Sequence, residues 1–231
     1  MLATRNLADS ATQTLRQEII DGDWTIGRTL PSEARLSARF GISRLTMREA
    51  LHRLRDQGLL QSRQGRGYTV QDFRSAGGPA LISTLLTGAD QSQASTAMAD
   101  LLLVRRQLAQ VVLLRLAQLR PPLQPISDAV DLFEDAAGRD ASIAELAALD
   151  AQVMTSLLKA TQSPVFGLFM NPLRETLIGT PTLAAALYRR PQDNVAAFRA
   201  LLLWLKDPQP EGVDRFIALL QARDEQSLAQ L

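Results

Sequence analysis

Residues 32–67 read SEARLSARFGISRLTMREALHRLRDQGLLQSRQGRG, and this stretch decides the fold of the N-terminal part of the chain. Ser32 and Ser43 each stand directly before a run of apolar residues at helical spacing, where a serine can act as N-cap. Gly41 lies between the two runs, at a position where a left-handed residue ends a helix. The sequence therefore predicts two short helices joined by a tight turn.

The flanking segments complete one compact unit. Residues 6–22 carry apolar side chains at helical spacing up to Gly22, which predicts a helix in front of the pair. After Gly58, the stretch LLQSRQGRGYTVQ has two short apolar-rich arms around residues 64–67, a pattern typical of a β-hairpin. Three helices followed by a hairpin predict a winged helix-turn-helix domain, with the hairpin as its wing.

Positive charge is concentrated in this part of the chain. Residues 1–73 hold 11 Lys and Arg against 8 Asp and Glu, whereas the remaining residues hold 14 against 16. The helix after Ser43 places Arg44 and Arg48 at its N-terminal end, away from its apolar stripe. Such a helix fits the DNA major groove, where arginine can bond two acceptors of guanine. The alternative is that these arginines form a solvated surface with no ligand.

Composition limits the class of protein. Hydrophobic residues make up 46% and charged residues 21% of the chain, which is typical of a protein that buries a core. The chain has no cysteine, which excludes disulfides and thiol catalysis. Neither an apolar run of membrane-spanning length nor a signal sequence at the N-terminus is found, so we expect a cytoplasmic protein.

The segment FRSAGGP at residues 73–79 combines two glycines with a proline, which is typical of a linker. We predict a DNA-binding domain over 1–73, a linker over 74–80 and an all-helical domain over 81–231. The fold class is therefore mainly α: a winged helix-turn-helix domain followed by a helical bundle.

Helix signals recur throughout the second domain. Residues 96–119 are apolar on nearly all sides, which predicts a helix buried at the centre of the bundle. Ser142 and Glu145 form a capping box, and Ser163 before Pro164 predicts a capped helix start. Pro172 is expected to kink or break the helix that follows. Further prolines predict a break at Pro181 and two last helix starts near Pro191 and Pro210.

The N-terminal residues resemble those of the GntR family of bacterial regulators. The resemblance covers about 60 residues and rests on Leu30-Pro-Ser-Glu33, Leu36, Phe40 to Arg44, Thr46, Arg48 to Leu51, Leu54, Gly58 to Leu60 and Gly65 to Gly67. It implies operator contacts by the helix after Ser43, by the preceding helix and by the hairpin tip. The implied DNA-binding residues are Arg35, Ser43, Arg44, Thr46, Arg48, Gln64, Gly65 and Arg66. This chain departs from the family at Ala34, where an arginine is usual.

The helical half is similar to the FadR-like branch of this family, and within it to regulators of fatty-acid metabolism. The matching strings are Asp100 to Arg105, Leu149-Asp150, Ser163 to Leu168 with Asn171, and Phe73 to Gly77. The resemblance implies a long-chain acyl-CoA or fatty-acid-like effector, with Arg105 as partner of its anionic group. It also implies an apolar wall formed by Leu101, Leu108, Met154, Leu157, Phe166 and Phe169. The alternative is that these side chains are plain core.

Many members of this branch hold a metal with one aspartate and three histidines. The single histidine of this chain is His52, in the predicted DNA-binding helix, so we expect no metal and no other cofactor. Asp150 stands where the family aspartate lies, but a lone aspartate is more often a capping or surface residue.

We therefore expect a homodimeric regulator that binds a pseudo-palindromic operator and leaves it when the effector binds. One alternative is a GntR-type regulator of another metabolite, and another is a helical adaptor without specific DNA binding. An enzyme would have to rest on the carboxylates of one short helix, Asp128, Asp131, Glu134 and Asp135, which we expect to form a solvated face.

Overall fold

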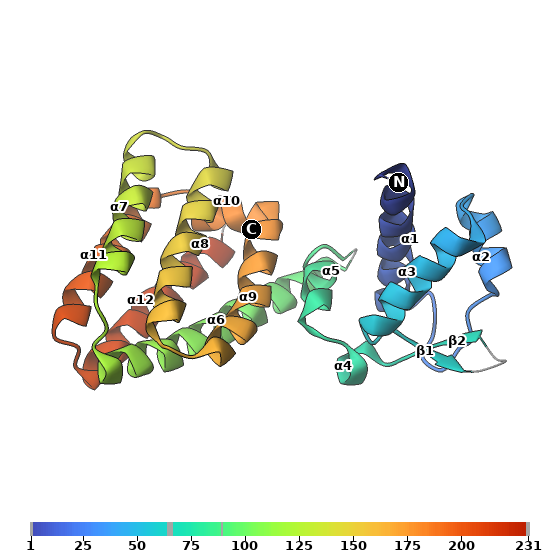
Figure 1. Ribbon diagram of the computed structural model, residues 1–231, viewed down its shortest axis with the longest axis horizontal. Helices are drawn as coiled ribbons and strands as arrows, with labels where there is room; N and C mark the ends of the chain where they lie inside the picture. The colour runs from blue at the N-terminus through green and yellow to red at the C-terminus, as the bar shows by residue number, and fades with distance from the viewer. Residues whose placement is uncertain (1, 64–66, 89, 230–231) are drawn as a thin grey trace. The chain divides into compact units, whose positions relative to one another are not determined.

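The computed structural model describes residues 2–63, 67–88 and 90–229, and it divides into two compact units, Met1–Ala97 and Met98–Leu231 (Figure 1). The first contains α1 (Leu2–Ile20), α2 (Glu33–Phe40), α3 (Arg44–Asp56), β1 (Leu60–Arg63), β2 (Gly67–Val70), α4 (Phe73–Ala76), the 3-10 helix η1 (Pro79–Leu81) and α5 (Ile82–Leu86). The predicted order of three helices and a hairpin is confirmed.

Both predicted serine caps are present. The Ser32 hydroxyl oxygen accepts a hydrogen bond from the backbone N–H of Arg35 at 3.4 Å, and that of Ser43 accepts from the N–H of Thr46 at 3.1 Å. Gly41 ends α2 with φ +64°, a conformation that L residues with a side chain rarely adopt. The turn between α2 and α3 is therefore set by local chemistry that the sequence displays.

The wing is a two-stranded antiparallel sheet. Leu60 lies opposite Val70 and Arg63 opposite Gly67, and an isolated bridge joins Thr29 to Thr69. The two ends nearest the helices, Leu60 and Val70, are buried. The wing is thus anchored at its base by core side chains.

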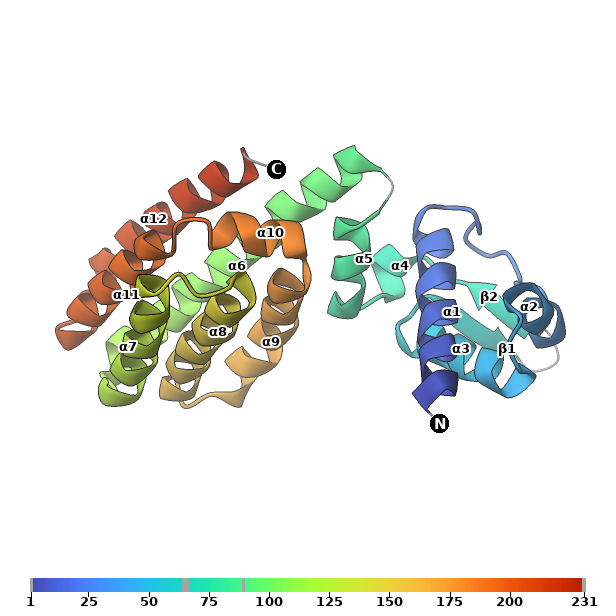
Figure 2. The ribbon, with the colours of Figure 1, turned by 90° about the horizontal axis from the view of Figure 1, so that it is seen from above.

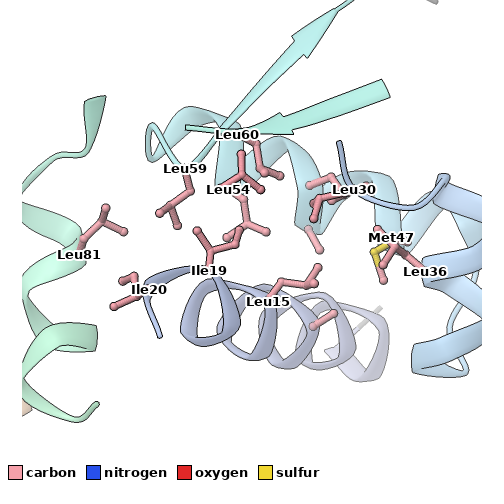
Figure 3. Close-up of a cluster of buried hydrophobic side chains, with 14 residues drawn as sticks. Leu15, Ile19, Ile20, Leu30, Leu36, Met47, Leu54, Leu59, Leu60 and Leu81 are labelled. Atoms are coloured by element: carbon pink, nitrogen blue, oxygen red, sulfur yellow. The ribbon is translucent and has the colours of Figure 1, made fainter. Parts of the chain in front are cut away.

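Buried side chains of α1, α2, α3, β1, β2 and η1 form one hydrophobic core in this unit, and Figure 3 shows this cluster. Ile19 of α1 points toward Leu54 of α3 and toward Leu59, and Leu15 of α1 is buried in the same cluster. Leu81 of η1 is buried in the same cluster. Segment 74–80, predicted as a linker, carries the end of α4 and the start of η1, and the compact units divide between Ala97 and Met98, inside α6.

The second unit is all helical. It contains most of α6 (Gln91–Leu119), then α7 (Gln124–Gly138), α8 (Ile143–Ala160), α9 (Pro164–Gly179), α10 (Pro181–Leu187), α11 (Pro191–Lys206) and α12 (Pro210–Leu228). In Figures 1 and 2, α7, α8 and α9 lie side by side, and α11 packs on α7. The last four helices each begin at a proline, the first-turn position that proline tolerates best.

Three details of the second unit differ from the sequence-based expectation. Ser163 makes no capping hydrogen bond with its side chain, although α9 starts at Pro164 as predicted. Pro172 lies inside α9 and does not break it. The buried neighbours Met170 and Leu173 hold this helix against the bundle and outweigh the loss of one backbone hydrogen bond.

The third difference concerns α6, which is not buried on all sides. One face is buried, whereas four large apolar side chains on the other remain 38–47% exposed: Leu103, Val104, Val111 and Leu114. Among the described residues, no helix combines the length and the hydrophobicity needed to span a membrane.

Candidate functional site

α3 has one buried and one exposed face. Its buried face packs on the core through Thr46, Met47, Ala50, Leu51 and Leu54. Arg44, Arg48 and Arg55 are exposed on the rest of the helix. The N-terminal end of α3 therefore presents guanidinium groups to solvent on a rigid, capped helix.

Arg48 is held by an ion pair. Its Nη2 lies 2.8 Å from Oε2 of Glu33, and its Nε donates to both oxygens of that carboxylate at 3.0 and 3.2 Å. The hydrogen bonds that Arg48 donates to the Glu33 carboxylate raise the pKa of the Arg48 guanidinium above its ordinary value. The Arg48 side chain is still 54% exposed, so Glu33 orients it without covering it. Among the described residues, no ion pair involves Arg44.

Other basic side chains of the first unit are paired within the protein. Arg39 pairs with Glu18, Arg53 with Asp9 and Glu49, and Arg55 with Asp56. Part of the basic excess is therefore neutralised in place. Arg44 and Arg48 are exposed at the N-terminal end of α3, the end that would approach the bases in a DNA major groove.

The other predicted DNA-binding residues have different surroundings. Ser43 and Arg35 are exposed, at the first turns of α3 and α2. Thr46 is only 3% exposed, and its hydroxyl oxygen lies 2.8 Å from that of Ser43. Gln64, Gly65 and Arg66, at the predicted wing tip, lie outside the described residues.

The second unit encloses a cavity of about 170 Å³. It lies among α6, α8, α9, α10, α11 and α12, and apolar side chains such as Leu157, Leu173 and Phe198 form most of its wall. Of the residues predicted to bind an effector, Arg105, Met154 and Leu157 line this cavity. The other four, Leu101, Leu108, Phe166 and Phe169, lie outside its lining, and Phe169 is 64% exposed.

Polar side chains gather at one part of the cavity wall. Asp150 lies there, within α8 and partly buried, and not at a cap or on the exposed surface. Its Oδ2 accepts a hydrogen bond from the Tyr188 hydroxyl at 3.1 Å. Burial raises the pKa of the Asp150 carboxyl. The pKa of the Tyr188 phenol is also raised, mainly by burial and to a smaller extent by the negative charge of Asp150.

Two helices are joined beside this polar group. Asp224 of α12 is fully buried, and its two oxygens accept hydrogen bonds from Arg105 Nη2 and Arg106 Nη1 of α6, both at 2.6 Å. Its neighbour Arg223 donates to Asn194 and lines the cavity. Burial lowers the pKa of the Arg223 guanidinium. Tyr188, Asn194 and Arg223 are cavity residues that were not predicted from the sequence.

The carboxylates of α7 lie on the surface of the second unit. Arg199 pairs with Asp131 at 2.7 Å and also with Glu134, and both acids are about half exposed. Across the described segments, no three His, Cys, Asp or Glu side chains lie close enough together to hold a metal ion.

Comparison with known proteins identifies the N-terminal segment. Residues 7–70 match the family model described as "Bacterial regulatory proteins, gntR family". The HTH-type transcriptional regulator Mce2R of Mycobacterium tuberculosis is 39% identical over 82 residues. That match covers 36% of this chain and 34% of Mce2R, about a third of the relative's length.

Longer similarity is found with regulators named for fatty-acid metabolism. The fatty acid metabolism regulator protein of Pectobacterium carotovorum is 28% identical over 175 residues, which is 75% of this chain and 70% of that protein. The solved structure of Lar, described as controlling the Listeria monocytogenes agr system, aligns with a TM-score of 0.61 at 12% identity, over 95% of both chains. E. coli McbR/YncC aligns with a TM-score of 0.53 at 17% identity, over 97% of both chains. The two structures share the fold.

Proposed function

Because residues 7–70 form a helix-turn-helix domain of the GntR family, we propose that this protein regulates transcription by binding duplex DNA through α3. The observation that supports this most directly is the exposure of Arg44 and Arg48 at the Ser43-capped end of the helix. Arginine at this end of a recognition helix can bond O6 and N7 of guanine. Ser43 and Arg35 are placed to contact phosphates, and Gln64, Gly65 and Arg66 are proposed for the minor groove.

We further propose that the protein acts as a homodimer, in the cytoplasm, where its DNA target is accessible. A helix-turn-helix dimer presents two recognition helices to two half-sites, which explains pseudo-palindromic operators. The exposed apolar side chains of α6 support a second copy as partner, since monomers rarely leave large apolar patches uncovered.

The cavity of the second unit is proposed as the effector site. Its apolar wall with a few convergent polar groups is the usual composition of a small-molecule site. The relatives named fatty acid metabolism regulators favour a fatty-acid-like ligand or a long-chain acyl-CoA. Binding would release the protein from DNA, provided that the effector binds the released state more tightly. A different small metabolite is the second candidate.

In vitro selection from a pool of randomised duplexes tests the DNA-binding proposal. We expect enrichment of a sequence with two half-sites related by twofold symmetry. Adding palmitate or palmitoyl-CoA should then release the selected duplex. A pool that shows no enrichment after repeated rounds would contradict sequence-specific DNA binding, and would favour an adaptor without specific DNA contacts.

A further inference from the structure

We propose that the exposed face of α6 is the contact surface of the homodimer, in which two copies of this helix pack antiparallel about a twofold axis at Gln107. The inference rests on the homodimer proposed above and names the surface that forms it. It is based on the spacing of the exposed residues of α6, on their symmetry about Gln107, and on the positions of Asp100 and Arg115.

The exposed face of α6 carries a stripe of residues with the spacing of a coiled-coil seam. Its members are all exposed and follow one another at alternating intervals of four and three residues: Asp100, Val104, Gln107, Val111 and Leu114. This spacing keeps side chains on one side of a helix, where a second helix can interlock with them. The residues that α6 buries in its own unit, such as Leu102, Leu113 and Leu116, lie on the opposite side. α6 therefore has one face for its own bundle and another that a second helix can cover.

Apolar side chains occupy the middle of this stripe. Val104 and Val111 are each 47% exposed, and Leu103 beside them is 46% exposed. A second copy packed on this face would remove these side chains from water, and the free energy gained rises with the apolar area that is covered. The same helix face on two copies can thus supply both sides of one apolar contact.

The stripe is symmetric about Gln107. Val104 precedes Gln107 by three residues and Val111 follows it by four. In a twofold contact, if residue i of one copy meets residue j of the other, then j also meets i. An antiparallel pair centred on Gln107 therefore places Val104 of each copy against Val111 of the other. The two Gln107 amides meet at the axis, where each can donate and accept a hydrogen bond, and a polar residue in a seam fixes the register of the helices.

Two charges set the direction of the pair. Asp100 and Arg115 are exposed toward the two ends of the stripe, and within the described part of the chain neither takes part in an ion pair. Antiparallel packing about Gln107 brings Asp100 of each copy beside Arg115 of the other. Parallel packing would instead bring each residue beside its own copy, and like charges across an interface are unfavourable. Because an exposed ion pair contributes little to affinity, loss of Arg115 alone should leave the dimer in place.

Single cysteines in the full-length protein can report this arrangement, because the chain has no cysteine of its own. We expect Gln107→Cys to give a covalent dimer with a short bismaleimide, since the two copies of this residue meet at the axis. Asp100→Cys should not link to itself, because the two copies of this position lie roughly 22 Å apart in an antiparallel pair, at a rise of about 1.5 Å per residue. After subunit exchange with Arg115→Cys, it should link to that variant.

Each other outcome of the cross-linking contradicts the proposal. Linkage of Asp100→Cys to itself would indicate a parallel pair. Leu132→Cys is the control, since Leu132 is 52% exposed on α7, outside the proposed surface; a yield equal to that of Gln107→Cys would overturn the assignment. No linkage of Gln107→Cys in a protein that sediments as a dimer would overturn the surface and leave the homodimer standing. A protein that sediments as a monomer would contradict both.

A charge placed in the stripe tests the contact without a cross-linker. We expect Val111→Glu to raise the dissociation constant of the dimer roughly tenfold or more, measured by analytical ultracentrifugation, because a carboxylate would be buried against Val104 without a partner. Val165→Glu is the matched control, since Val165 is 52% exposed on α9; it should leave the constant within about twofold. Equal effects of the two substitutions would overturn the proposal. Far-UV circular dichroism checks that each variant is folded.

Duplex binding by the wild type distinguishes this inference from the regulator proposal. A dimer that gives the expected cross-links but binds no duplex would contradict DNA binding and leave the α6 contact standing. A protein that binds a selected duplex as a dimer, without linkage of Gln107→Cys, would contradict the α6 contact alone.

Discussion

Arg44 is the residue on which sequence discrimination should depend most clearly. It is exposed at the first turn of α3, and Arg44→Ala removes a guanidinium that can bond guanine in two places. We expect the preference for a selected duplex over a scrambled one to fall by roughly 1–3 kcal/mol, measured by fluorescence anisotropy. Arg115→Ala is the control, since it removes the same charge from an exposed site in the second unit. Equal discrimination by wild type and Arg44→Ala would exclude Arg44 from base reading.

Ser43 has a second role that can be measured without DNA. Its side chain accepts from the Thr46 N–H and contacts the buried Thr46 hydroxyl. Ser43→Ala should lower the free energy of unfolding by about 1 kcal/mol, measured by urea denaturation. Ser163→Ala is the matched control, because Ser163 occupies the same position before α9 but makes no side-chain capping bond. Equal losses in the two variants would show that the cap contributes nothing specific.

Asp150 should make stability depend on pH in a defined direction. Burial raises its pKa in the folded protein, so the folded state holds a proton that the unfolded carboxyl releases above about pH 3.9. Stability is therefore lost as the pH rises from that value toward the raised pKa. Asp150→Asn remains neutral and can still accept from Tyr188. We expect the variant to be more stable than wild type at pH 7 and the difference to shrink toward pH 4, measured by thermal denaturation. A wild type that is more stable at pH 7 would contradict this.

Residue roles that depend on near neighbours could be predicted from the sequence, and those that depend on distant ones could not. Ser32, Ser43 and Ser142 cap as expected, because the atoms that they bond are three residues away. Tyr188 meets Asp150 across 38 residues, and Asp224 meets Arg105 across 119. No spacing rule connects such pairs, since only the packing of whole helices brings them together.

At the scale of elements, Gly58 connects α3 with the wing and passes close to α4. It has φ +79°, and a Cβ built on it would lie 1.9 Å from the carbonyl oxygen of Ala76. Gly22 has φ +90°, and a Cβ built on it would have no other atom within 4 Å. Gly22→Ala should therefore cost roughly 1–2 kcal/mol of stability from its backbone conformation alone. Gly58→Ala should cost roughly 1–3 kcal/mol more, because backbone must move. Urea denaturation of both variants measures the difference, and similar losses would contradict the close approach of α4.

Helix starts and ends were largely predictable, whereas burial of a helix face was not. Prolines at 164, 181, 191 and 210 begin helices as their fixed φ favours. The apolar composition of α6 predicted burial on all sides, yet Val104 and Val111 are each 47% exposed. The amino-acid composition of a helix shows which of its faces could be buried, whereas the packing of neighbouring helices determines which face is buried. Packing also explains the result at Pro172, because α9 continues through this residue although a kink or break was expected there.

At the scale of the whole molecule, the sequence separates a basic first part from a slightly acidic second part, and the structure divides into two compact units. The winged fold could be predicted because its signals are local and follow one another in order. For the cavity, the sequence indicated only that the second unit contains apolar helices that could surround one. Its position and its arginines depend on contacts among six helices of the second unit.

The central claim is that the first unit binds duplex DNA through phosphates and base edges, and the salt dependence of binding tests it most directly. Affinity of the full-length protein for a selected duplex is measured by fluorescence anisotropy between 50 and 200 mM NaCl. We predict that the logarithm of the binding constant falls linearly with the logarithm of salt concentration, by roughly a factor of a hundred or more over this range. A binding constant that does not change with salt, or no binding at 50 mM, would contradict the account.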